Sequence, residues 1–310
     1  MIIISDSHQL SISEFDSESS GASMGLVGVT YSPELDLYAA VGKNTIQTSP
    51  DGLAWTEKAT PNSEMQKIDW SPSLGLFVAV GRQSYVDGTG LKVLAKSDDG
   101  ETWTITTVSE EVSWIRWSPE AGKFYGSDIT IPDFVSTTDG LSWASAGLAG
   151  SHNIAGFAYS PELGRILLAN SSGGVAKYSD DNGVSWQTES FTGDTPTIGH
   201  LAYSPKDNLF VASYFHTGTL QTFYSSDGVH WSKSNNSIPN VRNLIWIPEY
   251  RSFLATRDVW AVAYSSVNGK DWSSPISILT NVVDWKWIPN ENALITVSLG
   301  SPYAYFLRPK

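Results

Sequence analysis

The chain has 310 residues, of which 41% are hydrophobic and 12% aromatic, so it can bury a large core. Its formal net charge of −13 argues against a nucleic-acid backbone or an anionic membrane as the main partner. It contains no cysteine, which excludes disulfides, thiolate metal ligands and a cysteine nucleophile.

The N-terminal segment is predicted to form a strand and not a targeting signal. Residues 1–6 have no basic region and only a short apolar run, and no stretch of the chain resembles a membrane span. Two strand-like runs lie at residues 2–7 and 10–15. Residues 16–25 are rich in Ser, Gly and acidic side chains and are predicted to be a linker.

A first repeated motif, an aromatic residue followed by Ser-Pro or Ile-Pro, then occurs seven times. Proline sets φ for the first corner of a tight turn. Asp36, Gly75, Gly164 and Asn208 can adopt the left-handed conformation that closes it. Successive aromatic residues are 39, 47, 42, 44, 43 and 41 positions apart. They are Tyr31, Trp70, Trp117, Tyr159, Tyr203, Trp246 and Trp287.

A second motif, Ser-x-Asp-Gly-x-x-Trp and its close variants, alternates with the first. Asp-Gly and Asn-Gly are strong hairpin signals, and the carboxylate can accept hydrogen bonds from the turn's own N–H groups. The regular spacing favours a structural role for these acids and tryptophans over a catalytic one. They are Asp51, Trp55, Asp99, Trp103, Asp139, Trp143, Asp181, Trp186, Asp227, Trp231, Asn268 and Trp272.

The two motifs together predict four short strands per repeat, with no helical periodicity. We therefore predict an all-β fold: a seven-bladed β-propeller of four-stranded antiparallel blades, forming a single domain over residues 1–310. Blades are expected to start near residues 28, 67, 114, 156, 200, 243 and 284. The last repeat has only three strands, so residues 1–15 are predicted to complete it. The alternative is six blades with loose ends.

The second motif resembles the Asp-box, or BNR, repeat of sialidases, sortilin-like receptors, two-domain xyloglucanases and photosystem II assembly-factor propellers. Only Ser179–Trp186 has the full family spacing, and the other five copies are one residue shorter. Taken together, the two motifs look most like propellers encoded in bacteriophage tail modules and related bacterial genes. The resemblance implies that these turns lie away from the ligand-binding face.

No catalytic constellation emerges from the chain. A sialidase needs an arginine triad and a tyrosine nucleophile, but only seven arginines exist and the family's Arg-Ile-Pro signature is absent. A glycosidase needs two carboxylates that face each other across a sugar, whereas the prominent acids here recur once per blade in turns. The five histidines share no metal-ligand spacing, so neither a metal nor a cofactor is predicted.

The axial mouth should be bordered by the start of each innermost strand. Lys67, Asp69, Arg116, Asp284 and Lys286 fall at channel-facing positions, one or three residues before the motif aromatics. These charges either pair around the channel or contribute to a ligand site. Trp285 lies two residues before its motif aromatic, at a position expected to pack in the blade. Trp114 and Trp260 fit no repeat position.

A ligand surface is predicted on the loop-rich face, where exposed aromatics can stack on sugars or anchor proteins and basic groups can donate hydrogen bonds. The alternative is that Trp114 fills the channel mouth and Trp260 packs against its own loop. The candidate residues are Tyr85, Trp114, Arg116, His152, Tyr214, His216, Arg257 and Trp260.

These observations favour a non-catalytic recognition or structural module. The resemblance suggests a phage virion or tail component that binds a host-surface glycan or a partner protein, with no nucleic acid and no membrane insertion. Such a protein would reside in the virion, or in the cytoplasm before assembly. The alternatives are a glycan-cleaving enzyme and an intracellular assembly scaffold.

Overall fold

The chain is known from a computed structural model. It describes residues 15–19, 25–83, 92–108, 112, 114–119, 121–127, 134–148, 154–170, 175–190, 197–215, 221–236, 238, 241–257, 262–278, 282–298 and 304–309.

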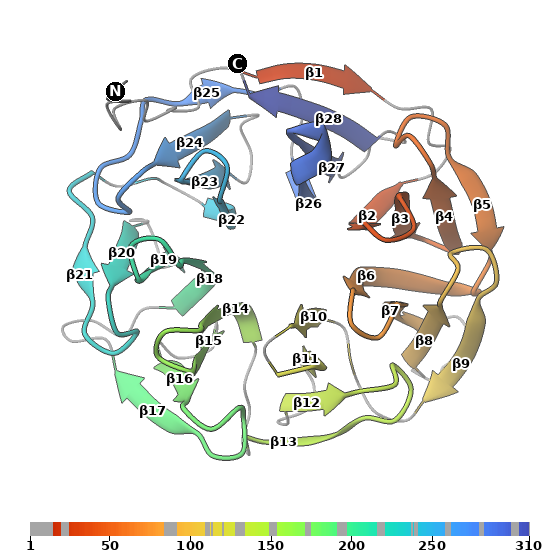
Figure 1. Ribbon diagram of the computed structural model, residues 1–310, viewed down its shortest axis with the longest axis horizontal. Coiled ribbons are helices and arrows are strands. Elements are labelled where there is room, and N and C mark those ends of the chain that lie inside the picture. The colour runs from red at the N-terminus through yellow and green to blue at the C-terminus, as the bar shows by residue number, and fades with distance from the viewer. Residues whose placement is uncertain are drawn as a thin grey trace, which may run out of the picture.

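Seven four-stranded antiparallel sheets are arranged in a ring, with one strand of each sheet next to the axis (Figure 1). This confirms the predicted seven-bladed all-β fold and rules out the six-bladed alternative. We number the blades 1 to 7 along the chain, from the sheet that begins at residue 26. The only helical element among the described residues is a short 3-10 turn, η2 (Pro289–Glu291).

In blades 1 to 6 the strands run outward from the axis in sequence order, and in blade 7 the last three strands of the chain are followed by the N-terminal strand. The innermost strands are β2 (Leu26–Ser32), β6 (Ser63–Ser71), β10 (Trp114–Ser118), β14 (Ile154–Ser160), β18 (Thr197–Ser204), β22 (Val241–Ile247) and β26 (Val282–Ile288). The second strands are β3 (Leu37–Gly42), β7 (Leu76–Gln83), β11 (Lys123–Ser127), β15 (Arg165–Asn170), β19 (Leu209–Phe215), β23 (Ser252–Arg257) and β27 (Ala293–Ser298).

The two outer positions of each blade are shorter and more polar. The third strands are β4 (Thr45–Ser49), β8 (Lys92–Ser97), β12 (Phe134–Thr137), β16 (Val175–Ser179), β20 (Gln221–Ser225), β24 (Val262–Ser266) and β28 (Ala304–Pro309). The outermost strands are β5 (Thr56–Ala59), β9 (Thr104–Val108), β13 (Ala144–Leu148), β17 (Gln187–Ser190), β21 (Ser232–Lys233), β25 (Ile276–Ser277) and, for the last blade, β1 (Phe15–Ser19).

The N-terminal strand closes the ring, as predicted, but it lies further along the chain than expected. β1 pairs antiparallel with β28, from Phe15 opposite Pro309 to Ser19 opposite Tyr305. The predicted strand runs 2–7 and 10–14 lie outside the described residues, and most of β1 falls in the segment that was predicted to be a linker. An outermost strand needs only backbone pairing to one neighbour, so its polar sequence carries no alternating apolar signal.

The Ser-Pro motifs form the turns between the first and second strands. Ser32 Oγ accepts a hydrogen bond from Leu35 N at 3.1 Å, and Ser71 Oγ accepts one from Leu74 N at 3.1 Å. The chain then passes through the left-handed region, with φ of 50° at Asp36 and 59° at Gly75. The predicted chemistry of these turns is therefore confirmed.

The Asp-Gly motifs form the turns between the third and fourth strands. Oδ1 of Asp51 accepts hydrogen bonds from the N–H groups of Leu53 and Ala54, both at 2.8 Å, and Trp55 Nε1 donates to Gly52 O at 2.9 Å. In blade 6, Asn268 Oδ1 accepts the equivalent pair of N–H groups. A side-chain oxygen thus satisfies the turn's own donors in each case.

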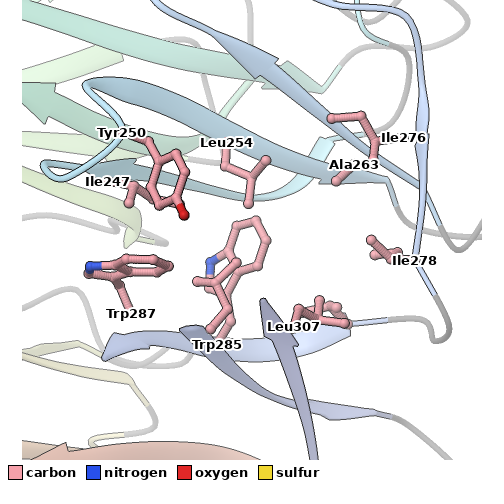
Figure 2. Close-up of a cluster of buried hydrophobic side chains, with 11 residues drawn as sticks. Ile247, Tyr250, Leu254, Ala263, Ile276, Ile278, Trp285, Trp287 and Leu307 are labelled. Carbon is pink, nitrogen blue, oxygen red and sulfur yellow. The ribbon is translucent and has the colours of Figure 1, made fainter. Parts of the chain in front are cut away.

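The core consists of seven clusters, and each cluster lies between two neighbouring blades. Between blades 6 and 7, Trp285 and Trp287 extend from β26 toward Ile247, Tyr250 and Leu254 (Figure 2). The rings of Tyr250 and Trp287 meet edge to face, with centroids 5.8 Å apart. Trp285 therefore packs between blades, as its place in the repeat predicted.

Candidate functional site

The innermost strands bring channel residues to the axis through a repeated irregularity. In six of the seven inner hairpins the pairing register shifts by one residue near the start of the innermost strand, as between Met65 and Lys67 and between Val282 and Asp284. β10 pairs regularly from its first residue, Trp114. An extra residue of this kind bends the strand and re-aims the side chains that follow it.

Two cavities lie along the axis and meet at a waist. The cavity at the start of the innermost strands, which we call the axial cavity, has a volume of about 900 Å³. The cavity on the Ser-Pro turn face has a volume of about 600 Å³. The waist is formed by the residues that line both cavities: Arg116, Phe157, Leu201, Leu244, Ile245, Lys286 and Trp287.

Two ion pairs cross one side of the channel and connect blades 2 and 7. Lys67 Nζ lies 2.8 Å from Asp284 Oδ1, and Lys286 Nζ lies 2.9 Å from Asp69 Oδ1. Each of the two blades thus supplies one lysine and one aspartate. These four charges pair around the channel, which is the first of the two alternatives predicted for them. We call this set of four residues the charge clamp.

Blade 1, which lies between blades 2 and 7, carries small side chains at the same positions, and so the clamp can span it. A Cβ on Gly28 would lie 3.2 Å from Lys67 Cα, so the innermost strands of blades 1 and 2 approach closely there. Thr30 Oγ1 donates to Asp69 Oδ1 at 3.3 Å, and Val29 N donates to Asp284 Oδ2 at 3.2 Å. Both clamp carboxylates are therefore hydrogen-bonded to blade 1 as well.

Asp69 is the most constrained charge in the channel. Besides Lys286 and Thr30 it accepts hydrogen bonds from Trp70 N at 3.0 Å and Trp117 N at 2.9 Å. Burial raises the pKa of this carboxyl, but Lys286, Arg116 and the Trp117 N–H outweigh burial and hold the pKa below its ordinary value. Asp69 is thus a buried anion with fixed partners on three sides.

The wall opposite the clamp is apolar and belongs to blades 4, 5 and 6. It is lined by Phe157, Leu201, Leu244 and Ile245, with His200 and Asn243 nearer the mouth. A Cβ on Gly156 would lie 2.8 Å from Leu201 N, so blades 4 and 5 approach as closely as blades 1 and 2. The axial cavity therefore has one charged wall and one apolar wall.

The structure brings only two of the predicted ligand residues to the axial cavity. Trp114 is half-buried at the cavity edge, where its ring lies 6.4 Å from that of Phe157, and Arg116 is exposed at the waist. Arg257 lies at the end of β23 and lines none of these cavities. The side chain of Tyr214, in β19, and the whole of Tyr85, His152, His216 and Trp260 lie outside the described residues.

Sequence reasoning missed the apolar wall. Phe157, Leu201 and Leu244 occupy positions that the repeat assigns to blade packing, so nothing in the pattern distinguishes them from other core residues. It also missed Lys43 and Glu64 at the rim. These two residues form an isolated backbone bridge between blades 1 and 2, and only the ring geometry reveals it.

The acids of the Asp-Gly turns line neither the axial cavity nor the cavity on the Ser-Pro turn face, and they serve as hydrogen-bond acceptors. Hydrogen bonds from the hydroxyl and N–H of Ser185 lower the pKa of Asp181 to about 2. Backbone N–H groups of Ala54 and Leu53 likewise lower the pKa of Asp51. Within the described residues no group of three or more His, Asp or Glu side chains could hold a metal ion.

The ring of seven four-stranded blades defines the class of protein as a seven-bladed β-propeller. In the described ranges no helix is long and apolar enough to cross a membrane. No protein-family model matches the chain, and no curated protein matches it.

Solved structures do resemble it. YCF48 bound to a D1 peptide has a TM-score of 0.67 and 11% identity, over 97% of this chain and 100% of that one. The GH74 xyloglucanase from Xanthomonas campestris has a TM-score of 0.70 and 15% identity, over 92% of this chain and 52% of that one. Streptogramin B lyase has a TM-score of 0.73 and 11% identity, over 96% and 98%. At such low identity the likeness concerns the fold alone.

Proposed function

We propose that this propeller is a non-catalytic recognition module that binds its partner in the axial cavity. The observation that carries the proposal is the cavity itself, which measures about 900 Å³ and combines one apolar wall with one charged wall. Concave sites of this size, with a few directed polar groups on an apolar surface, are typical of ligand binding.

The state of the channel carboxylates supports recognition over glycan cleavage. A glycosidase needs one acid with a raised pKa opposite a second, free carboxylate. The pKa of Asp69 is lowered, and its oxygens accept bonds from Lys286, Thr30 and two backbone N–H groups. Asp284 is held by Lys67 and Val29 N. Both acids are thus engaged in structure.

We further propose that the partner is an extended protein segment. One structural neighbour, YCF48, is bound to a peptide, and this supports an extended protein segment as a partner here. A glycan remains the second candidate, because two aromatic residues, Trp114 and Phe157, line the cavity and aromatic rings can stack on sugars. The repeat pattern suggests a phage virion or tail as the setting.

The proposal is tested by filling the cavity. Asn243→Trp places a large ring in the mouth, whereas Val184→Trp adds the same ring to an exposed turn of blade 4, where Val184 is 77% exposed. We expect a glycan array and a peptide array to give the same hits with wild type and Val184→Trp, and to lose them with a folded Asn243→Trp. Hits retained by Asn243→Trp would contradict the proposed site.

Catalysis is tested separately with a panel of chromogenic glycosides and host-cell polysaccharides. We expect no turnover by the wild-type protein. Turnover that is abolished by Glu64→Gln or Asp284→Asn, two acids at the cavity, would overturn the recognition role in favour of glycan cleavage.

A further inference from the structure

Arg116 holds an unusual place in the channel. It lies in the middle of β10, its side chain is exposed, and it lines the axial cavity, the cavity on the Ser-Pro turn face and the small space between them. A ligand that enters from the mouth and reaches the waist would therefore meet this guanidinium.

The charges that line this small space do not cancel. Two carboxylates, Asp69 and Asp284, face three cations, Lys67, Lys286 and Arg116, which leaves one positive charge in excess. The lysines are the cations that ion-pair directly with the carboxylates. Arg116 acts on Asp69 through space, and among the described residues its guanidinium makes neither a hydrogen bond nor an ion pair. The excess charge therefore resides on a guanidinium whose donors bond to no described residue.

The waist residues of blades 4, 5 and 6 are apolar. Phe157, Leu201 and Ile245 line the waist together with the guanidinium. Ala158 and Ala202 occupy the corresponding channel positions of blades 4 and 5, so space remains at this level for an apolar group. A ligand seated here would meet Arg116, the lysine Lys286 that is already paired with Asp69, and the apolar residues of blades 4 to 6.

We propose that Arg116 binds the carboxylate of a monoanionic ligand whose apolar part lies against Phe157, Leu201 and Ile245. This inference rests on the proposed recognition role of the axial cavity. One excess positive charge matches a monoanion, and the planar fork of a guanidinium can bind both oxygens of a carboxylate at once. The same chemistry occurs in the C-terminus of a peptide that ends in an apolar residue and in a small aryl or alkyl acid.

Two pairs of probes distinguish these sources. The first pair is 4-phenylbutyrate and its primary amide, and the second is N-acetyl-Ala-Ala-Phe with a free or an amidated C-terminus. Binding is measured by titration calorimetry. We expect at least one acid to bind about 10- to 100-fold more tightly than its amide, as is usual for hydrogen bonds to charged groups. The probe pair that shows the difference identifies whether the ligand is a small acid or the C-terminus of a peptide.

Substitutions then assign the preference to Arg116. Arg116→Gln should bind acid and amide equally, and Arg116→Lys should retain part of the preference because it keeps the charge without the fork. Lys206→Gln removes one positive charge from an exposed Ser-Pro turn and should behave as wild type. Thermal melting verifies that each variant is folded, which we expect because Arg116 bonds to no described residue.

The inference is overturned if the wild type binds acid and amide equally, if no probe binds at millimolar concentration, or if Arg116→Gln keeps the preference. None of these results tests the cavity as a site. If the array hits are still lost in Asn243→Trp, the proposed function stands without the anion. If Asn243→Trp also keeps its hits, both proposals fail.

Discussion

The two neighbouring aspartates of the blade 2 turn differ sharply in their contacts. Oδ1 of Asp99 accepts hydrogen bonds from the N–H groups of Glu101 and Thr102, both at 2.7 Å. These bonds lower the pKa of Asp99. Asp98 is exposed and accepts neither N–H group. The Asp99 carboxylate is thus coupled to folding through these hydrogen bonds.

A carboxyl whose pKa is lower in the folded state stabilises the fold above its unfolded pKa of about 3.9. That contribution is lost as the pH falls through the lower folded pKa. We therefore expect the melting temperature to fall on acidification below about pH 4, and less steeply in Asp99→Asn. An asparagine can still accept both N–H groups, as Asn268 does in blade 6.

The measurement is thermal melting between neutral and strongly acidic pH. Asp98→Asn provides the matched control and should follow the wild-type curve. If Asp98→Asn and Asp99→Asn flatten the curve equally, the hydrogen bonds of Asp99 are not the source of its pH dependence.

A comparison of two turn glycines distinguishes the cost of backbone strain from the cost of a steric clash between blades. Gly75 and Gly100 both have positive φ, 59° and 73°. A Cβ on Gly75 would meet nothing within 4 Å, but a Cβ on Gly100 would lie 2.3 Å from Leu37 Cδ2 in blade 1. Gly100 is therefore needed both for its φ and for the close approach of blade 2 to blade 1.

We expect Gly75→Ala to lower the free energy of unfolding by about 1 kcal/mol, from strain alone. Gly100→Ala should lower it by about 2 to 4 kcal/mol, because overpacking adds to the strain. Urea unfolding of both variants measures the difference. Equal losses would show that Leu37 moves aside without cost.

At the scale of strands, the charge clamp connects the innermost strands of blades 2 and 7 across blade 1. Its two pairs differ in burial: the Asp69 side chain is 6% exposed, whereas those of Lys67 and Asp284 are 27% and 16% exposed. Removing one partner of a buried pair leaves an uncompensated charge, which costs more than the loss of an exposed pair.

We therefore expect Lys286→Met to lower the free energy of unfolding by about 3 kcal/mol, since it leaves Asp69 buried without its lysine. Lys67→Met should cost about 1 kcal/mol, because water can still reach Asp284. Guanidinium unfolding compares the two variants. If Lys286→Met costs no more than Lys67→Met, Arg116 or solvent compensates Asp69 fully.

At the scale of the whole molecule, the ring depends on the pairing of β1 with β28. A truncation that begins at residue 15 retains β1, whereas one that begins at residue 20 removes it and exposes the edge of β28. Unpaired strand edges recruit other chains. We expect the shorter deletion to behave as wild type and the longer one to melt several degrees lower and to aggregate.

Light scattering during a thermal ramp distinguishes the two truncations. Equal behaviour of both proteins would mean that backbone pairing at the outermost position of blade 7 contributes little to closure. If the shorter deletion is already as unstable as the longer one, residues 1–14 contribute the closing contacts instead of β1.

The repeat made the architecture predictable, but it predicted fewer of the residues of the candidate site. Seven aromatic-Pro motifs alternating with Asp-Gly turns specify strand pairs through local backbone chemistry, so the number of blades followed from counting. Arg116 and Trp114 were found because they break the pattern at channel positions. Phe157 and Leu201 obey the pattern and therefore gave no signal.

The sequence by itself determined the blades, their turns and the channel-facing positions, because each depends on residues close together in the chain. Only the tertiary structure decided which charges pair. Asp69 and Lys286 are 217 residues apart and meet only when the ring closes. The same is true of β1: its polar sequence does not predict its position, which is set by pairing with the edge of β28. Contacts that depend on ring closure leave no periodic trace in the sequence.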